Sequence, residues 1–209
     1  SGGKENIADM RTVGWELEMT WKDRIQNVLG SPLDYSLTVG LSDYQAEITK
    51  YDNPNGSVAS GMYHKGQKLG EIWGYVIDGY IQDDFEAAKM NYLQKFISSK
   101  WYPGDIRYKD LNGDGIIDKG KVTLDNPGDQ KVIGNSTPRY RFNLQGGIGW
   151  HGFDIRAIFE GVMKRDLWTG SDVFWGFSRG IYNSNVTQYH IDNTWTYENP
   201  TAYYPRPNT

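Results

Sequence analysis

Residues 139–160 read RYRFNLQGGIGWHGFDIRAIFE. Aromatic and aliphatic residues recur at almost every second position on both sides of the dipeptide His151-Gly152. A period of two is typical of a β-strand with one apolar face, and a short turn between two such runs predicts an antiparallel hairpin. We therefore expect paired strands within 139–163, with arginine, asparagine and glutamine on the opposite face.

The first 51 residues carry the same pattern. Residues 13–22 alternate without a fault, which predicts a strand, and a second alternating run covers residues 35–42. A weaker strand is expected through Ala46 and Ile48. Residues 23–34 include Gly30 and Pro32 and are interpreted as a turn region. The first two strands are expected to pair antiparallel, so the predicted fold class is all-β.

Residues 52–138 are rich in glycine and are expected to form loops with short extended pieces. One helix is predicted near residues 83–99, because Asp83 can cap its start and Glu86 follows three residues later. A narrow apolar stripe supports this helix, which we expect to be an accessory element packed on an external loop. The stripe consists of Phe85, Ala88 or Lys89, Tyr92 and Phe96.

One motif in this region is chemically specific. The sequence from Asp110 to Asp118, DLNGDGIID, has oxygen side chains at relative positions 1, 3, 5 and 9 and glycine at position 6. This spacing matches a calcium loop of the EF-hand kind, although Lys121 stands where a bidentate acid is expected. A turn without a metal is the alternative. The expected ion is Ca²⁺ in a structural role. Its candidate ligands are Asp110, Asn112, Asp114, Ile116, Asp118 and Asp129.

Composition excludes several classes of function. The chain has no cysteine, which removes disulfides and thiolate chemistry, and its net charge of -4 without a basic cluster argues against nucleic-acid binding. The three histidines lack zinc-binding spacing, and no nucleophile elbow or phosphate loop is present. We therefore predict no enzymatic activity. Apolar runs are too short for a transmembrane helix, whereas membrane strands would leave only a weak signal.

Several ordered segments resemble the SusC/RagA family of TonB-linked outer-membrane transporters. The carrying segments are GDIRYKDLNGDGIID at 104–118, DQKVIGNSTPRYRF at 129–142, GWELE at 14–18, GEIWGY at 70–75 and WTYENPTAYYPR at 195–206. In family members, matching segments belong to the late barrel region. The family's plug domain, TonB-contacting segment and signal peptide would lie upstream of this chain, and its final strands downstream.

The resemblance implies a partial outer-membrane β-barrel with long external loops. Residues 1–209 would be a fragment of one barrel domain, with strands in 1–51, extracellular-type loops in 52–138, a hairpin in 139–163 and an aromatic-rich loop in 164–209. It also implies import of oligosaccharides or peptides across the outer membrane of a Gram-negative bacterium. The implied partners are a SusD-like surface lipoprotein and, through the missing N-terminal region, TonB.

Exposed aromatic residues in a loop of such a transporter are candidates for substrate contact. The candidates are Trp168, Trp175, Tyr182 and Trp195. Alternation by itself fits a second class equally well, because a soluble β-sandwich with one wet face has the same pattern. The alternative hypothesis is thus a small soluble, calcium-stabilised β module that binds glycans.

Overall fold

The computed structural model describes residues 8–176 and 186–207, which belong to two compact units. We call the first the sheet unit, formed by Ser1–Asp52, Tyr63–Glu71 and Asn135–Leu167. The second is the loop unit, formed by Asn53–Met62, Ile72–Gly134 and Trp168–Thr209. Strands dominate the described residues, which confirms the predicted β class.

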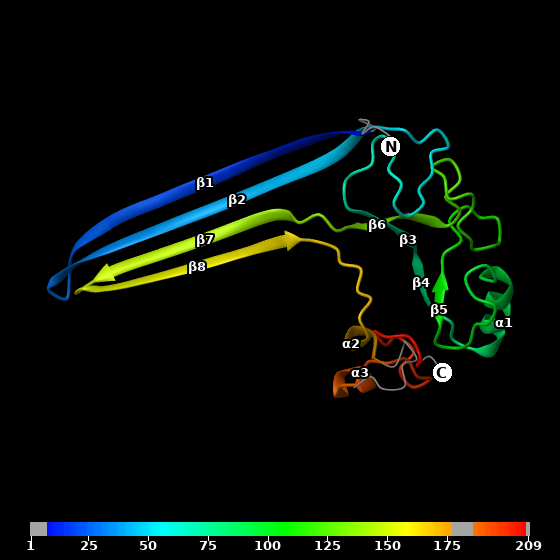
Figure 1. Ribbon diagram of the computed structural model, residues 1–209. Helices are drawn as coiled ribbons and strands as arrows, with labels where there is room; N and C mark the ends of the chain where they lie inside the picture. The colour runs from blue at the N-terminus through cyan, green and yellow to red at the C-terminus, as the bar shows by residue number, and fades with distance from the viewer. Residues whose placement is uncertain (1–7, 177–185, 208–209) are drawn as a thin grey trace, which may run out of the picture. The chain divides into compact units, whose positions relative to one another are not determined.

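The sheet unit contains one four-stranded antiparallel sheet (Figure 1). Its strands are β1 (Ala8–Val28), β2 (Ser31–Tyr51), β7 (Arg139–Trp150) and β8 (Phe153–Lys164), in the order β1-β2-β7-β8. Both predicted hairpins are confirmed, and β2 pairs with β7 to join them. The two hairpin turns lie at the same end of the sheet because Leu33 is opposite Trp150.

The predicted turn at residues 23–34 is wrong in extent. Strands β1 and β2 continue to Val28 and from Ser31, so only Leu29 and Gly30 lie between them. Both residues have positive φ, at 50° and 89°, as a two-residue type I′ turn requires. Pro32 is tolerated because the β1–β2 register shifts there, so the ladder needs no N–H donor from it.

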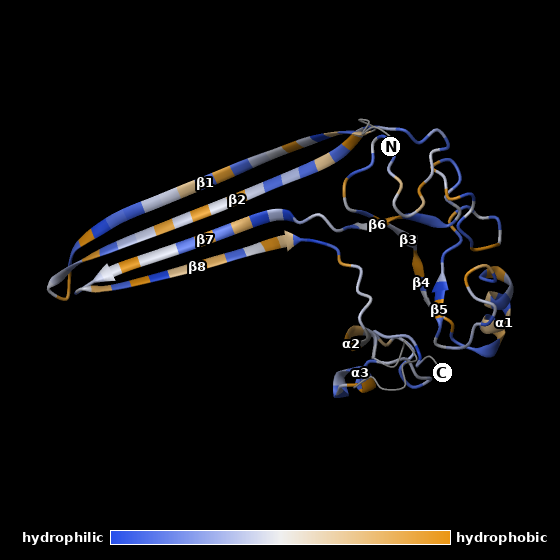
Figure 2. Cartoon of the chain, viewed as in Figure 1, coloured by the Kyte–Doolittle hydropathy of each residue, from blue (hydrophilic) through white to orange (hydrophobic). Residues whose placement is uncertain are grey.

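The register places residues of one kind on one face across all four strands. Alternate residues of a strand point to opposite faces, and Figure 2 shows the changing hydropathy along each strand. The paired positions keep this alternation in step between neighbouring strands. The apolar face carries Val13, Trp15, Leu17, Met19, Trp21, Leu33, Tyr35, Leu37, Val39, Leu41, Phe142, Leu144, Ile148, Trp150, Phe153, Ile155, Ala157 and Phe159. The polar face carries Glu16, Glu18, Thr20, Lys22, Ser36, Thr38, Arg141, Asn143, Gln145, Asp154, Arg156 and Glu160, together with two apolar residues of β8, Ile158 and Val162.

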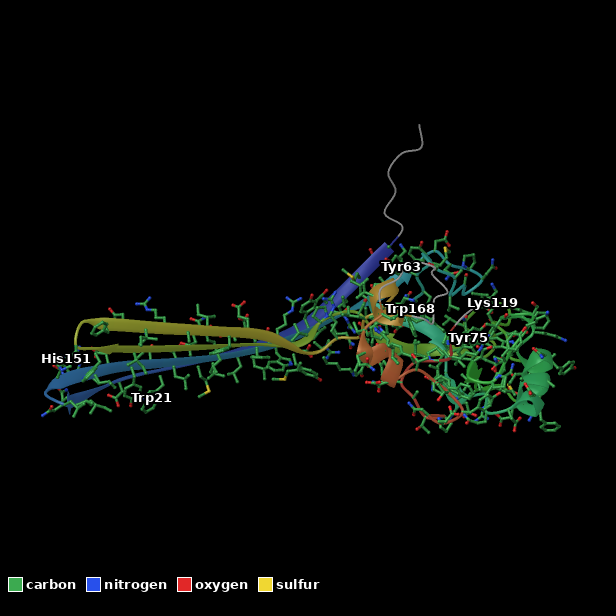
Figure 3. The ribbon with its side chains drawn as sticks, turned by 90° about the horizontal axis from the view of Figure 1, so that it is seen from below. Trp21, Tyr63, Tyr75, Lys119, His151 and Trp168 are labelled. Atoms are coloured by element: carbon green, nitrogen blue, oxygen red, sulfur yellow. The ribbon has the colours of Figure 1, made fainter. Side chains whose placement is uncertain are left out.

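The apolar face is exposed in the part of the chain that the structure describes. Trp21 is 63% exposed and Phe159 62%, and Figure 3 shows Trp21 projecting from the sheet near the turn that holds His151. The buried residues of this sheet, among those described, lie on β2 from Gly40 onward, and Ala46 and Ile48 near its far end are 5% exposed. There the segment around Gln67 pairs with β2, Ile48 N–H donating to the Gln67 carbonyl at 2.9 Å.

The loop unit is built from short elements. Strand β3 (Glu71–Tyr75) pairs with β6 (Gln130–Asn135), and β4 (Ile77–Tyr80) pairs antiparallel with β5 (Ile106–Tyr108). Its core gathers Ile81, Ala87 and Met90, with Leu93 and Trp101 packed against them. The region expected to be loops with extended pieces therefore has a small core of its own.

Helix α1 (Asp84–Leu93) begins as predicted and ends earlier. The Asp83 carboxylate accepts the Glu86 N–H at 2.8 Å, and the Glu86 carboxylate accepts the Gln82 N–H at 2.9 Å. The helix stops at Leu93 because the side chain of Gln94 turns to β5, donating to the Ile106 carbonyl and accepting the Tyr108 N–H. The expected packing stripe is wrong: Ala87 and Met90 face the core, whereas Phe85 is 83% exposed.

The described residues of the C-terminal part include two short helices that the sequence did not predict, α2 (Asp172–Trp175) and α3 (Gln188–Asp192). After α3, the Trp195 N–H donates to the Tyr204 carbonyl at 2.9 Å. Arg206 then forms an ion pair with Asp105 at 2.6 Å, which joins this segment to the residues before β5. No helix among the described residues is long and apolar enough to cross a membrane.

Candidate functional site

The predicted metal ligands lie in one loop of the loop unit, which we call the acidic loop (Asp110–Asp129). Asp129 is fully buried, and its carboxylate accepts backbone N–H groups from Leu111 at 2.6 Å and Asp118 at 2.9 Å. The Asp129 N–H in turn donates to the Asp118 carbonyl at 2.9 Å. One side chain therefore joins the beginning and the end of the calcium-like motif.

The other acids of the motif also accept local backbone donors. The two carboxylate oxygens of Asp110 accept the N–H groups of Gly113 at 2.6 Å and Gly115 at 2.8 Å. Asp114 accepts the Ile116 N–H at 2.8 Å. Gly115 has a φ of 80°, in the region that glycine adopts without strain, which agrees with its predicted role in the turn.

These residues fit Ca²⁺ in kind. Asp110, Asn112, Asp114 and Asp118 offer the oxygen ligands that a hard cation prefers. Among the described residues, however, no three acids or histidines are placed so that they could hold one metal ion. Asp129, the acid expected to replace Lys121, is already engaged by backbone donors. The Asp129 carboxylate thus closes the acidic loop through hydrogen bonds to the loop's own backbone.

The negative charge of the acidic loop contributes to a raised pKa of the neighbouring Tyr75. Burial raises the pKa of Tyr75, and the negative charges of Asp118 and Asp129 raise it further. Burial also raises the pKa of Tyr108, whose ring lies 5.3 Å from that of Tyr75. Both hydroxyls therefore stay protonated well above neutral pH.

Three of the four predicted ligand-contact aromatics lie in the described part of the chain, and their surroundings differ. Trp168 is 71% exposed, while Trp175 donates its indole N–H to the Thr169 carbonyl at 2.7 Å. Trp195 is 5% exposed and packs over Gly104, where a Cβ atom would collide with its ring. This burial favours a structural role for Trp195. Tyr182 lies outside the described residues.

The exposed apolar face of the sheet is the second candidate site, and its height can be derived from the strands. Strand β7 is apolar on this face from Tyr140 to Trp150. At about 3.4 Å per residue this stretch is about 34 Å long, which a strand tilt of about 40° would reduce to about 26 Å. The sheet therefore carries a continuous apolar band of about that height, which we call the apolar band.

A polar contact bounds the apolar band at one end. Within the band the Tyr35 hydroxyl donates to Asp23 at 3.3 Å, and Leu33, Trp150 and Phe153 continue the apolar face beyond this contact toward the tight turns. Toward the other end, the buried carboxylate of Asp43 accepts a hydrogen bond from Arg139 Nε at 2.6 Å. Because Asp43 follows Leu41 on the apolar face, the ion pair with Arg139 sets the end of the band. The sequence did not indicate this pair, whose members are far apart in the chain.

The polar face is lined with charged and hydroxyl side chains. The hydroxyls of Thr20 and Thr38 are hydrogen-bonded across β1 and β2 at 2.9 Å. A hollow of about 420 Å³ lies over Gly40, where a Cβ atom would collide with the Asn143 side chain. Glu16, Arg141 and Glu160 also line this hollow. The face is thus suited to water and polar solutes, in contrast to the opposite face.

Searches for related proteins did not add a relative: no protein-family model matches the chain, and no curated protein matches it either.

Proposed function

We propose that the sheet unit is part of the wall of an outer-membrane β-barrel, and that the chain belongs to an energy-coupled importer of oligosaccharides or peptides. The observation that carries the proposal is the register, which aligns the apolar residues of four strands on one exposed face. In a membrane wall this face contacts lipid, and the polar face with Arg141 and Glu160 lines an aqueous lumen.

The dimensions and connections of the sheet support this proposal. Outer-membrane barrels have an apolar band about 25 Å tall, close to the height of about 26 Å that β7 would have at a barrel strand tilt of about 40°. They also have short turns on the periplasmic side and long loops outside. Here the tight turns Leu29-Gly30 and His151-Gly152 share one end of the sheet, whereas the chain leaves the other end for the long segments of the loop unit.

Aromatic residues near both ends of the apolar band add to the argument. Trp150 and Phe153 lie opposite each other beside the tight turns, and Trp15 lies opposite Asp43 toward the other end. Amphipathic rings collect at the two interfaces of a bilayer, where one side of the ring meets lipid and the other water. Import itself, and the SusD-like and TonB partners, rest on the family resemblance of the sequence motifs.

The proposal is tested by single-cysteine scanning, because the chain has no cysteine of its own. Cysteines at positions 16 to 19 of the membrane-embedded protein would be labelled with an environment-sensitive fluorophore. We expect brominated lipids to quench the label at positions 17 and 19, and a water-soluble quencher to act at positions 16 and 18. Positions 144 and 145 of β7 provide an independent test, with lipid quenching expected at 144 on the apolar face and aqueous quenching at 145 on the polar face.

A soluble β module gives a different result in the same experiment. If lipid quenching shows no period of two along β1, the apolar face does not contact a bilayer. The barrel-wall proposal would then be abandoned for the glycan-binding module, whose strands would bury this face against another protein surface.

A further inference from the structure

Two Asn-Gly pairs lie in the loop unit, Asn55-Gly56 and Asn112-Gly113. An asparagine followed by glycine can react with its own backbone, because no side chain shields the glycine nitrogen. That nitrogen attacks the asparagine Cγ atom, and the bond from Cγ to the side-chain nitrogen breaks. The glycine N–H proton leaves with the side-chain nitrogen as ammonia. Water then opens the succinimide ring and gives aspartate or isoaspartate, which adds a negative charge.

Three hydrogen bonds hold the Asn112-Gly113 pair. The Asn112 side chain accepts the Asp114 N–H through Oδ1 at 2.9 Å and donates to the Asp114 carboxylate through Nδ2 at 3.0 Å. The attacking nitrogen is engaged too, because the Gly113 N–H donates to the Asp110 carboxylate at 2.6 Å. A charged acceptor makes this a strong bond, and its negative charge opposes loss of the N–H proton. Ring closure at Asn112 therefore requires all three bonds to break.

The Asn55-Gly56 pair lies in a turn that restrains it less. The Gly56 N–H donates to the Asn53 carbonyl at 3.0 Å, and this acceptor carries no charge. In the described part of the chain, no hydrogen bond holds the exposed side chain of Asn55. The side chain of Asn53 fixes the turn instead, since its amide oxygen accepts the Ser57 N–H at 2.9 Å. The Asn55 side chain can thus approach the Gly56 nitrogen after one neutral bond has broken.

We propose that Asn55 is a site of spontaneous modification, which deamidates in the folded protein, whereas the hydrogen bonds of the acidic loop protect Asn112. Water is the only co-reactant, so the proposal is independent of the barrel wall.

Modification at Asn55 changes how its turn pairs with the acidic loop. The Gly56 carbonyl accepts the Leu124 N–H at 2.8 Å, and the Val58 N–H donates to the Val122 carbonyl at 2.9 Å. Isoaspartate lengthens the backbone by a methylene group directly before Gly56, which displaces this carbonyl. We therefore expect the pairing of residues 56–58 with residues 122–124 to loosen as the protein ages.

Peptide mapping by mass spectrometry tests the proposal on the full-length protein, incubated folded in detergent at mildly alkaline pH. Trypsin cleaves after lysine and releases peptides 51–65 and 110–119, each of which contains one Asn-Gly pair. We expect position 55 to deamidate about tenfold or more faster than position 112, because the three hydrogen bonds raise the barrier at Asn112. In the unfolded chain the two pairs should react at similar rates, which separates the effect of the fold from that of the sequence.

Two substitutions and an internal control sharpen the comparison. Asp110→Ala removes the charged acceptor of the Gly113 N–H and should accelerate deamidation at Asn112 by about tenfold, with no change at Asn55. Asn55→Gln should abolish modification of peptide 51–65, because glutamine cyclises far more slowly than asparagine. Asn53 in the same peptide should stay intact, since the following Pro54 has no N–H proton to lose.

Other results overturn the proposal. Equal rates at positions 55 and 112 in the folded protein would contradict it, as would a faster reaction at position 112. An unmodified position 55 in folded protein whose unfolded chain reacts would show that the turn protects Asn55. If limited proteolysis cuts aged protein near residue 55 no faster than fresh protein, the expected loosening is wrong. The folded and unfolded wild-type chains decide the outcome even where Asp110→Ala disturbs the acidic loop.

Discussion

At the scale of single residues, Asp129 organises the acidic loop. Its buried carboxylate contacts the backbone at Leu111 and at Asp118, which are the two ends of the calcium-like motif. A buried charge is costly unless it is fully hydrogen-bonded, and these donors supply the bonds. The stability of the acidic loop should therefore depend on this one side chain.

We predict that Asp129→Asn destabilises the protein by about 2–4 kcal/mol, because the amide group turns a donor toward buried backbone N–H groups and leaves them unsatisfied. Chemical denaturation measures this loss. The control is Glu198→Gln, an exposed acid elsewhere in the loop unit, which should change stability by less than about 0.5 kcal/mol. Equal effects of the two substitutions would contradict the assigned role of Asp129.

At the scale of elements, the hydrogen bonds of the acidic loop bear on whether the loop needs Ca²⁺ to keep its structure. Since Asp110, Asp114 and Asp129 accept backbone N–H groups, we expect the loop to keep its structure without a cation. The melting temperature should then be the same in a chelator as in millimolar Ca²⁺. A rise in melting temperature with Ca²⁺, abolished by Asp110→Asn, would instead support the calcium site predicted from the sequence.

The two faces of β7 should respond differently to the same charge. Leu144 lies on the apolar face and Gln145, the next residue, lies on the polar face. We predict that Leu144→Arg destabilises the membrane-embedded protein by about 2–4 kcal/mol, the cost of arginine facing lipid near the bilayer centre. Gln145→Arg should have little effect. Unfolding from lipid vesicles measures both, and similar losses would argue against lipid contact.

At the scale of the whole molecule, the sheet is open and both of its outer strands are edges among the described residues. Strands β1 and β8 each have a partner on one side only, and the face between them is apolar. Long unpaired edges and large apolar patches drive association in water.

We therefore expect the chain to associate without detergent and to become monodisperse in detergent micelles, as size-exclusion chromatography with light scattering would show. Gln145→Arg serves as the control. It lies on the polar face, so it changes neither the unpaired edges of β1 and β8 nor the apolar face. A folded monomer in detergent-free buffer would contradict the interpretation of the apolar band as lipid-facing.

Local patterns in the sequence determined the strands, hairpins and helix start. The period of two at residues 13–22 and 139–160 predicts a strand with two unlike faces, because alternate side chains of a strand must point in opposite directions. The His151-Gly152 turn and the Asp83 cap are equally local, since their hydrogen bonds or backbone angles involve residues a few positions apart. These features were therefore predictable without a structure.

Only the tertiary structure decided which distant parts meet. The pairing of β2 with β7, the ion pair of Asp43 with Arg139 and the bonds of Gln94 to β5 join residues that the sequence separates. It also decided which side of α1 is buried, because Ala87 and Met90 fit the core beside Ile81 whereas the larger aromatic rings lie outside. A periodic pattern specifies that a face exists, but the partner of that face depends on the packing of the whole chain.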